Sequence, residues 1–350
     1  MTQSTKKLLL HFFMICLFGT TAVAQNDDGP VKVMEQISKQ IELVNQKYLN
    51  YMSEMAHGRR AKKAVKKHEE FLKQIENAKY ALVEIPYYKG DRSLHESTKT
   101  YLNLINNLQR ENYSKVVNME EIAEQSYDAM EAYLLFKRKI NEKMDEAGKE
   151  RQRLVEEYCK KNNITLVDAP DTEKEKKMKL MGDVVDYHET LYLIFFKASI
   201  HDEQLIDAMN ENNLTAVEQI RNSLKKYSDE GLSRLDTVKS YRGTDATLKN
   251  ACKRALDFFK READMIEAYS DYKMKEESFN TIKKNFERSS KAQSDKAEVA
   301  KYNAAVQDIN KALEKFNQTN EQLNKQRSEI YKNWTDAESR FFDTNIPYAK

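Results

Sequence analysis

The sequence predicts an all-α protein, an elongated bundle of long, coiled-coil-like helices arranged as two pseudo-repeated helical units. Three observations lead to this prediction. The 350 residues include only eight glycines and four prolines, so most of the chain has no residue that would end a helix. Apolar residues recur at alternating spacings of three and four over long stretches. A short segment occurs twice, at residues 88–94 and 241–248.

The first 24 residues have the pattern of a signal peptide. Two lysines precede an apolar stretch at residues 8–18, and residues 22–24 (Ala-Val-Ala) form a cleavage site. We therefore predict export to the periplasm, the outer surface or the extracellular space, with a mature chain that starts at Gln25. A surface lipoprotein is the weaker alternative, because no small residue directly precedes Cys16.

The rest of the chain divides into two helical units. Helices are expected at residues 31–56, 59–84, 92–161, 175–210, 213–239, 245–290 and 295–342, the third with a break inside it. The first unit covers residues 25–165, a linker follows at 166–174, and the second unit covers 175–350. The first two helices and the following loop of each unit correspond, which predicts a duplication. The second unit adds a C-terminal heptad helix.

That last helix has a continuous heptad seam, which predicts a stripe that faces partner helices. The seam consists of Tyr302, Val306, Ile309, Leu313, Phe316, Asn320, Leu323, Arg327, Ile330, Trp334, Ala337 and Phe341. Asn320 and Arg327 are its polar members. We interpret them as residues that fix helix register, and a functional polar pair inside the bundle is the alternative.

The repeated segment is predicted to be a structural loop. Its repeated residues are Tyr88, Gly90, Asp91, Tyr241, Gly243 and Asp245. Glycine can take the positive φ that a tight turn after a helix needs. The aspartates are placed to cap the next helix, and the tyrosines can pack on the end of the bundle. A ligand site formed by the two loops is the alternative.

Charge and hydropathy exclude two classes of partner. The chain has 58 basic and 56 acidic residues, and two of the lysines belong to the predicted signal peptide, so the mature chain is close to neutral. A nucleic-acid-binding protein would need a basic excess. After residue 24 no apolar stretch is long enough to cross a membrane. We therefore predict no nucleic-acid partner and no transmembrane segment in the mature protein.

A basic run is the candidate binding surface. It consists of Arg59, Arg60, Lys62, Lys63, Lys66 and Lys67. An anionic partner such as a lipid headgroup, a polysaccharide or an acidic protein face would fit it. A solvated helix face is the favoured interpretation, because the chain as a whole is neutral.

Metal and catalytic chemistry are not expected. Glu54 and His57 have the E-x-x-H spacing of di-metal bundles, but a second copy is missing, because no glutamate precedes His68, His95, His188 or His201 by three residues. Two cysteines remain in the mature chain, Cys159 and Cys252, and can pair or stay free. Motifs of nucleotide binding or nucleophilic catalysis are absent. We predict neither a cofactor nor an enzymatic activity.

Residues 118–135, Asn-Met-Glu-Glu-Ile-Ala-Glu-Gln-Ser-Tyr-Asp-Ala-Met-Glu-Ala-Tyr-Leu-Leu, resemble the signature of a family of uncharacterised exported bacterial surface proteins named after a spirochaete member. Residues 56–59 (Ala-His-Gly-Arg) and 88–91 (Tyr-Lys-Gly-Asp) are similar to that family too. The resemblance covers much of residues 48–160. It implies an exported, envelope-associated helical protein and supplies no catalytic residues.

These observations predict a non-enzymatic surface or envelope protein that acts as an interaction module. Its partner would be a protein or another envelope component. A periplasmic structural or chaperone-like coiled-coil protein, which could form homo-oligomers, is the alternative. A metal-dependent enzyme that uses Glu54 and His57 is the third hypothesis.

Overall fold

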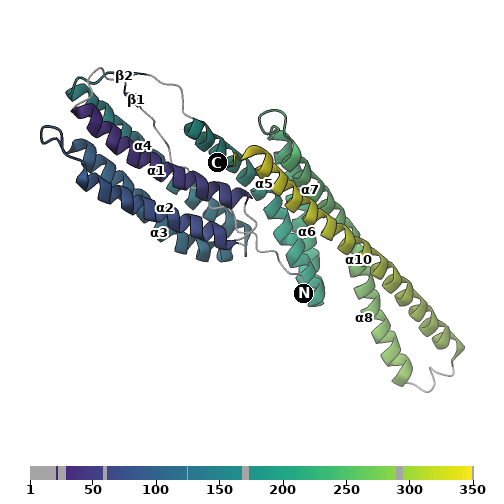
Figure 1. Cartoon of the computed structure of the whole chain (residues 1–350). Helices are drawn as coiled ribbons and strands as arrows, with labels where there is room; N and C mark the ends of the chain where they lie inside the picture. The colour runs from purple at the N-terminus through teal and green to yellow at the C-terminus, as the bar shows by residue number, and fades with distance from the viewer. Residues whose placement is uncertain are drawn as a thin grey trace. The chain divides into compact units, whose positions relative to one another are not determined.

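The computed structural model describes residues 21–22, 29–57, 61–123, 125–167, 173–288 and 295–348. The protein is all-α, as predicted (Figure 1). Two-residue strands β1 (Thr21–Ala22) and β2 (Leu166–Val167) form one small antiparallel pair. Strand β1 falls within the stretch assigned to the signal peptide, and the rest of that stretch lies outside the described residues.

The chain divides into two compact units. Unit 1 comprises residues 1–189 and 339–350, and unit 2 comprises residues 190–338. The sequence placed the boundary at residues 166–174 instead. The division falls later because apolar residues at the start of the next helix, such as Met181 and Val184, are buried in unit 1.

Unit 1 is built on helices that pair in chain order. They are α1 (Pro30–His57), α2 (Ala61–Glu84), α3 (Ser93–Ala123) and α4 (Tyr127–Lys161). Helix α1 packs on α2, α2 on α3, and α3 on α4. Aromatic residues fill much of the core: Tyr48 lies against Phe71 with ring centroids 5.3 Å apart, and Tyr133 is fully buried.

Two further helices contribute residues to both units. Helix α5 (Glu173–Asn210) supplies its residues up to Glu189 to unit 1 and the remainder to unit 2. Helix α10 (Lys296–Asn345) belongs to unit 2 up to Glu338, and its last turns belong to unit 1. In unit 1, the ring of His188 from α5 lies 4.7 Å from that of Phe342 from α10.

Unit 2 adds α6 (Leu214–Thr237), α7 (Thr247–Met265) and α8 (Glu267–Arg288). Helices α6 and α7 pack on each other, and aromatic side chains join α5 to α10. Phe195 stacks on Trp334 with centroids 4.2 Å apart, and Phe259 of α7 lies 6.1 Å from Phe195. Helix α8 and the first half of α10 extend beyond α6 and α7 (Figure 1).

Two expected helices are interrupted in the structure. The break expected within residues 92–161 separates α3 from α4, and the side-chain oxygen of Ser126 caps α4 by accepting from the N–H of Ala129 at 3.2 Å. The helix expected at 245–290 divides at Ile266 into α7 and α8. There the Tyr269 N–H donates to the Ile266 carbonyl at 3.0 Å, a tightened turn around a buried side chain.

The heptad seam of the last helix is confirmed. None of its twelve residues is exposed: those from Tyr302 to Asn320 are half-buried, and Leu323, Trp334, Ala337 and Phe341 are buried. The seam is therefore covered most completely towards its C-terminal end.

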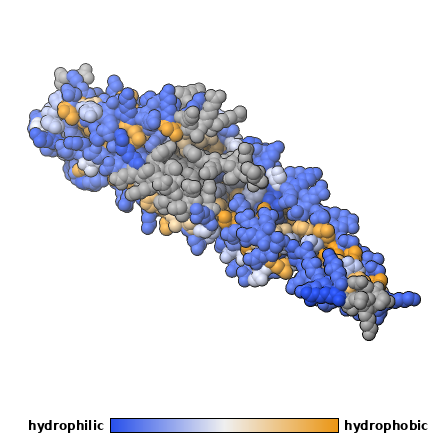
Figure 2. Space-filling model, turned by 90° about the horizontal axis from the view of Figure 1, so that it is seen from below, coloured by the Kyte–Doolittle hydropathy of each residue, from blue (hydrophilic) through white to orange (hydrophobic). Residues whose placement is uncertain are grey.

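The surface agrees with the interleaved charges of the sequence. The face drawn in Figure 2 is mostly hydrophilic, with apolar residues in small separate patches. Within the described ranges, no helix combines the length and the hydropathy that crossing a bilayer requires.

Candidate functional site

The two repeated loops have the same local backbone. In the first, Lys89 and Gly90 take φ values of 48° and 76°, and in the second Arg242 and Gly243 take 51° and 77°. Positive φ at two successive residues defines a tight turn that favours glycine. An isolated bridge closes each loop, between Tyr88 and Asp91 and between Tyr241 and Asp245.

Both loop aspartates accept a hydrogen bond from the first residue of the following helix, but the N-cap position of α7 is Ala246 rather than the predicted Asp245. Asp91 accepts a hydrogen bond from the N–H of Ser93 at 2.9 Å, and Asp245 accepts one from Thr247 at 2.9 Å. Asp91 also binds Lys161 at 2.8 Å. That lysine, together with the Ser93 hydrogen bonds, lowers the pKa of Asp91 to about 2.

The tyrosines of the loops pack as expected for a structural role. Tyr88 lies against Gly29, where an added Cβ would come within 3.1 Å of the ring, and Tyr241 is buried. The loops therefore position helix ends. The duplication itself stays a prediction.

The predicted basic run is only partly described. Arg59 and Arg60 lie outside the described residues, as does the side chain of Lys62. Lys63 and Lys66 are exposed on α2, whereas Lys67 binds Glu70 at 3.0 Å. An anionic partner for this run stays a prediction.

His57, the candidate metal ligand, has structural partners. Its Nδ1 lies 3.0 Å from Asp343 Oδ1, and its Nε2 lies 3.0 Å from the Ile346 carbonyl oxygen. Its ring stacks on Tyr348 with centroids 3.7 Å apart. In the part of the chain that the structure describes, no group of three or more His, Cys, Asp or Glu residues could hold a metal ion.

Both thiols are free and buried. Cys159 donates to the Met34 sulfur at 3.4 Å, and Cys252 lies 3.8 Å from the Leu191 carbonyl oxygen. Burial raises the pKa of Cys159, and it raises the pKa of Cys252 further, because that thiol is enclosed almost completely. Thiols in apolar surroundings are poor nucleophiles.

A cavity in unit 1 is the best candidate for a binding site. It measures about 220 Å³ and lies among α1, α4 and α5. Its floor is apolar and buried, and its rim is polar and more exposed. The floor consists of Tyr48, Met52, Met178, Met181 and Val185; Gly182 lines the wall; and the rim consists of Arg138, Asn141, Glu142, Asp145 and Asp186.

Helical periodicity gathers these residues on single faces. On α4, the lining residues lie three, four and seven positions after Arg138. On α5, they lie three, four, seven and eight positions after Met178. Tyr48 and Met52 are four residues apart on α1. The cavity is therefore formed where three helix faces meet, one of which carries charge and two of which are mainly apolar.

A buried ion pair links two walls of the cavity. Lys137 on α4 is 1% exposed and donates to Glu189 on α5 at 2.5 Å. Its ammonium also lies 5.7 Å from the centre of the Tyr133 ring. Because removing one partner would leave an uncompensated buried charge, the pair holds α4 and α5 together next to Arg138 and Asp186.

The rim carboxyl of Asp186 is in an unusual environment. Loss of surrounding water and the nearby Glu189 carboxylate raise its pKa above the usual range, against the opposite effect of Arg138. The Asp186 carboxyl therefore takes up a proton more readily than a carboxyl on an open surface does.

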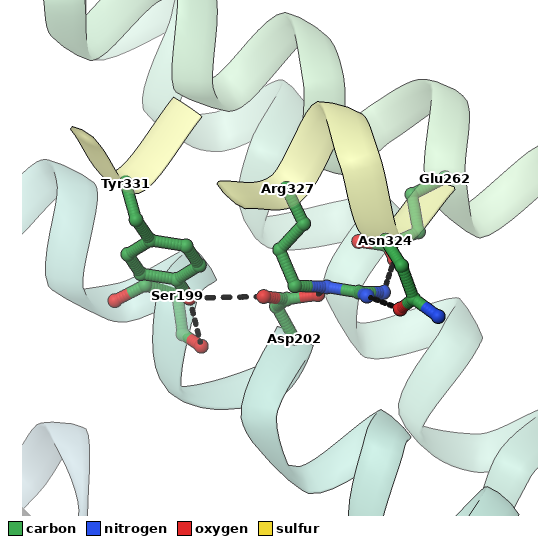
Figure 3. Close-up of polar contacts among 6 residues, drawn as sticks. All are labelled: Ser199, Asp202, Glu262, Asn324, Arg327 and Tyr331. Atoms are coloured by element: carbon green, nitrogen blue, oxygen red, sulfur yellow. Dashed lines mark hydrogen bonds and ion pairs between the residues drawn. The ribbon is translucent and has the colours of Figure 1, made fainter. Parts of the chain in front are cut away.

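Unit 2 contains a second polar cluster, on α5, α7 and α10 (Figure 3). Arg327 donates to Asp202 at 2.9 Å, donates a further hydrogen bond to Glu262, and donates to Asn324 at 2.5 Å. The Tyr331 hydroxyl donates to Asp202 at 2.9 Å and lies 3.4 Å from the Ser199 carbonyl oxygen.

Burial sets the protonation of this cluster. Asp202 and Glu262 are both fully buried. Desolvation and the neighbouring Asp202 raise the pKa of Glu262 to about 10, so Glu262 is protonated at neutral pH. One arginine then faces one carboxylate and one carboxylic acid, which leaves the trio neutral. The cluster supports the interpretation of Arg327 as a residue that fixes helix register.

The known proteins give no further guide to function. No protein-family model, curated protein or solved structure matches the chain.

The sequence did not reveal the cavity or the partners of Arg327. The cavity residues occur at ordinary core and surface spacings on three helices, so no local motif marks them. The only available signal for the cluster was a polar residue in an apolar seam, which indicated Arg327 but neither Asp202 nor Glu262.

Proposed function

We propose that this chain is an exported, non-enzymatic helical binding protein of the cell envelope. The observation that carries the proposal is the cavity of unit 1. An enclosed apolar floor with a few convergent polar groups is the usual composition of a small-molecule site. Tyr48 and Met52 are only 1% and 2% exposed, so the floor of the cavity is buried.

The positions of the residues with catalytic potential support a role in binding rather than in catalysis. The ring nitrogens of His57 face Asp343 and Ile346. Cys159 and Cys252 are buried thiols whose pKa is raised, so they are not prepared for nucleophilic attack.

Export rests on the signal-peptide pattern of residues 1–24 and on the resemblance of residues 118–135 to exported surface proteins. Protease shaving of intact cells, followed by mass spectrometry of peptides from residues 59–67 and 325–340, tests the location. Release without lysis would place the protein on the outer surface. Release only after the outer membrane is opened would place it in the periplasm, and resistance until the cytoplasm is opened would contradict export.

A thermal-shift assay tests the binding function. An extract of envelope components should raise the melting temperature of the wild-type protein, because a ligand that binds the folded state stabilises it. Gly182→Leu should fill the wall of the cavity and remove the shift. An equal shift in both proteins would contradict binding in this cavity, as would no shift in the wild type.

A structural or chaperone-like role is the second candidate, supported by one feature of unit 2. We call α8 together with residues 296–316 of α10 the arm. None of residues 271–288 or 295–311 is buried. The helices of the arm meet through half-buried aromatic rings: Phe286 stacks on Tyr302 at 4.6 Å and Tyr272 on Phe316 at 5.5 Å.

The arm would be covered by a second copy of the chain. A heptad seam covered by one partner helix leaves apolar area in water, which favours association. Both signs of charge alternate along the arm, so two copies would not repel each other. Light scattering should then detect a stable oligomer that Phe286→Ser returns to monomer. A monodisperse wild-type monomer would contradict this candidate and leave the cavity proposal unaffected.

A further inference from the structure

We propose that the unit 1 cavity binds a small amphipathic cation, with the apolar part of the ligand on the buried floor and its charged nitrogen at the rim. This inference rests on the proposed function, since it takes unit 1 as a binding unit, and it adds the chemical class of the ligand.

The floor selects an apolar group. Tyr48, Met52 and Met181 are 1%, 2% and 3% exposed, and Met178 and Val185 are buried as well. A space lined in this way offers water few hydrogen bonds, so an apolar chain replaces water at little cost. Methionine side chains are flexible and polarizable, and they adapt to chains of different shape.

The rim selects a positive charge. It carries three carboxylates, from Glu142, Asp145 and Asp186, and one cation, Arg138. Lys149 binds Asp145 at 2.6 Å and offsets its charge. Among the residues that line the cavity, carboxylates outnumber the single arginine, so an anionic head group should be repelled and an ammonium attracted.

Two features near the rim add to this selection. Lys137 donates to Glu189 at 2.5 Å in the buried ion pair, and it does not line the cavity. Asp186 carries a raised pKa because of desolvation and the Glu189 charge, and a bound ammonium would relieve that unfavourable environment.

The head group is tested with three probes that share one alkyl chain. Octylamine, octanol and octanoate are titrated into the full-length mature protein by calorimetry near neutral pH. Octylamine should bind most tightly, octanol more weakly, and octanoate weakest. Octanoate that binds as tightly as octylamine would overturn the inference.

Variants of the rim test whether Glu142 and Asp186 attract the ammonium group of the ligand. Glu142→Gln and Asp186→Asn should each weaken octylamine binding about two- to fivefold, the range of a partly exposed ion pair, and leave octanol binding unchanged. Glu146→Gln is the matched control, because Glu146 is exposed on the same helix but does not line the cavity. Equal octylamine affinity in wild type and the Glu142→Gln/Asp186→Asn double variant would overturn the inference.

Gly182→Leu tests the place of binding. It should abolish binding of both octylamine and octanol, and it should not unfold the protein, because leucine favours the helix more than glycine does. Octylamine binding that survives this change would overturn the inference.

The results separate this inference from the proposed function. If octanol or octanoate binds best and Gly182→Leu removes it, the cavity is a binding site and only the charge class is wrong. If no probe binds but an envelope extract still causes a Gly182-dependent thermal shift, the inference falls and the proposed function stands. If neither occurs, both fall.

Discussion

Arg327 of α10 donates to Asp202 of α5 at 2.9 Å, inside a unit where Asp202 is completely buried. Each charge of a buried ion pair needs the other, because either charge alone would be buried without compensation and would destabilise the fold. Glu262 completes the cluster as a neutral acid. Three helices that are distant in sequence are thereby fixed in one register.

Removing the arginine should be strongly destabilising. Arg327→Met leaves Asp202 charged and buried without a counter-charge, so the free energy of unfolding should fall by about 3–5 kcal/mol. Glu262→Gln keeps a neutral side chain of the same size and should not lower the free energy of unfolding by more than about 1 kcal/mol. Urea denaturation of both variants checks the contrast, and equal losses would show that Glu262 is charged in the folded protein.

The same acid predicts a dependence of stability on pH. The ordinary pKa of a glutamate is 4.5, and that of Glu262 is raised to about 10. Between these values the folded state holds a proton that the unfolded chain has lost, so stability from this group is full below 4.5 and is lost as the pH rises towards 10. Wild type should therefore lose stability relative to Glu262→Gln over that window in urea titrations. A difference that is constant with pH would contradict the assignment.

Asp91 should contribute stability that is lost as the pH falls, the opposite of the dependence expected for Glu262. Its pKa is lowered from 3.8 to about 2, so its contribution is present above 3.8 and is lost as the pH falls through 2. Asp91→Asn should cost about 1–2 kcal/mol at neutral pH through the weakened cap and the lost Lys161 pair. Melting temperatures of wild type and variant should converge in acid. Asp245→Asn, in the second loop, is the matched comparison.

The thiols should be unreactive in the folded protein. Cys159 and Cys252 are buried and their pKa values are raised by burial. Alkylation at neutral pH followed by peptide mass spectrometry should find both unmodified in native buffer and both modified in denaturant. Rapid native modification of Cys252 would show that the core around Leu191 opens.

The sequence predicted the helices well because their ends are locally encoded. Pro30 begins α1, and the Gly90 and Gly243 turns separate helices at positions where few other residues fit. The heptad seam also predicted which side of α10 faces inward, including Arg327. Periodicity is a property of one helix, so a single sequence suffices to reveal it.

Contacts between distant helices could not be predicted in this way. Asp202 follows His201 and precedes Glu203, a polar triplet that is typical of a solvated turn, yet Asp202 is completely buried. Arg327 lies 125 residues after Asp202 and 65 residues after Glu262 along the chain. The cavity likewise depends on how α1, α4 and α5 meet, and packing rather than local pattern decides that.

We propose that the chain is exported and holds a small ligand in unit 1. Native mass spectrometry of the protein recovered from the envelope of its own cells tests both parts at once. We expect a chain that starts at Gln25 and carries an additional small mass, which is lost in Gly182→Leu. A recovered chain that retains residues 1–24 would contradict export. Wild-type protein that carries no bound mass, like Gly182→Leu, would contradict a ligand in unit 1.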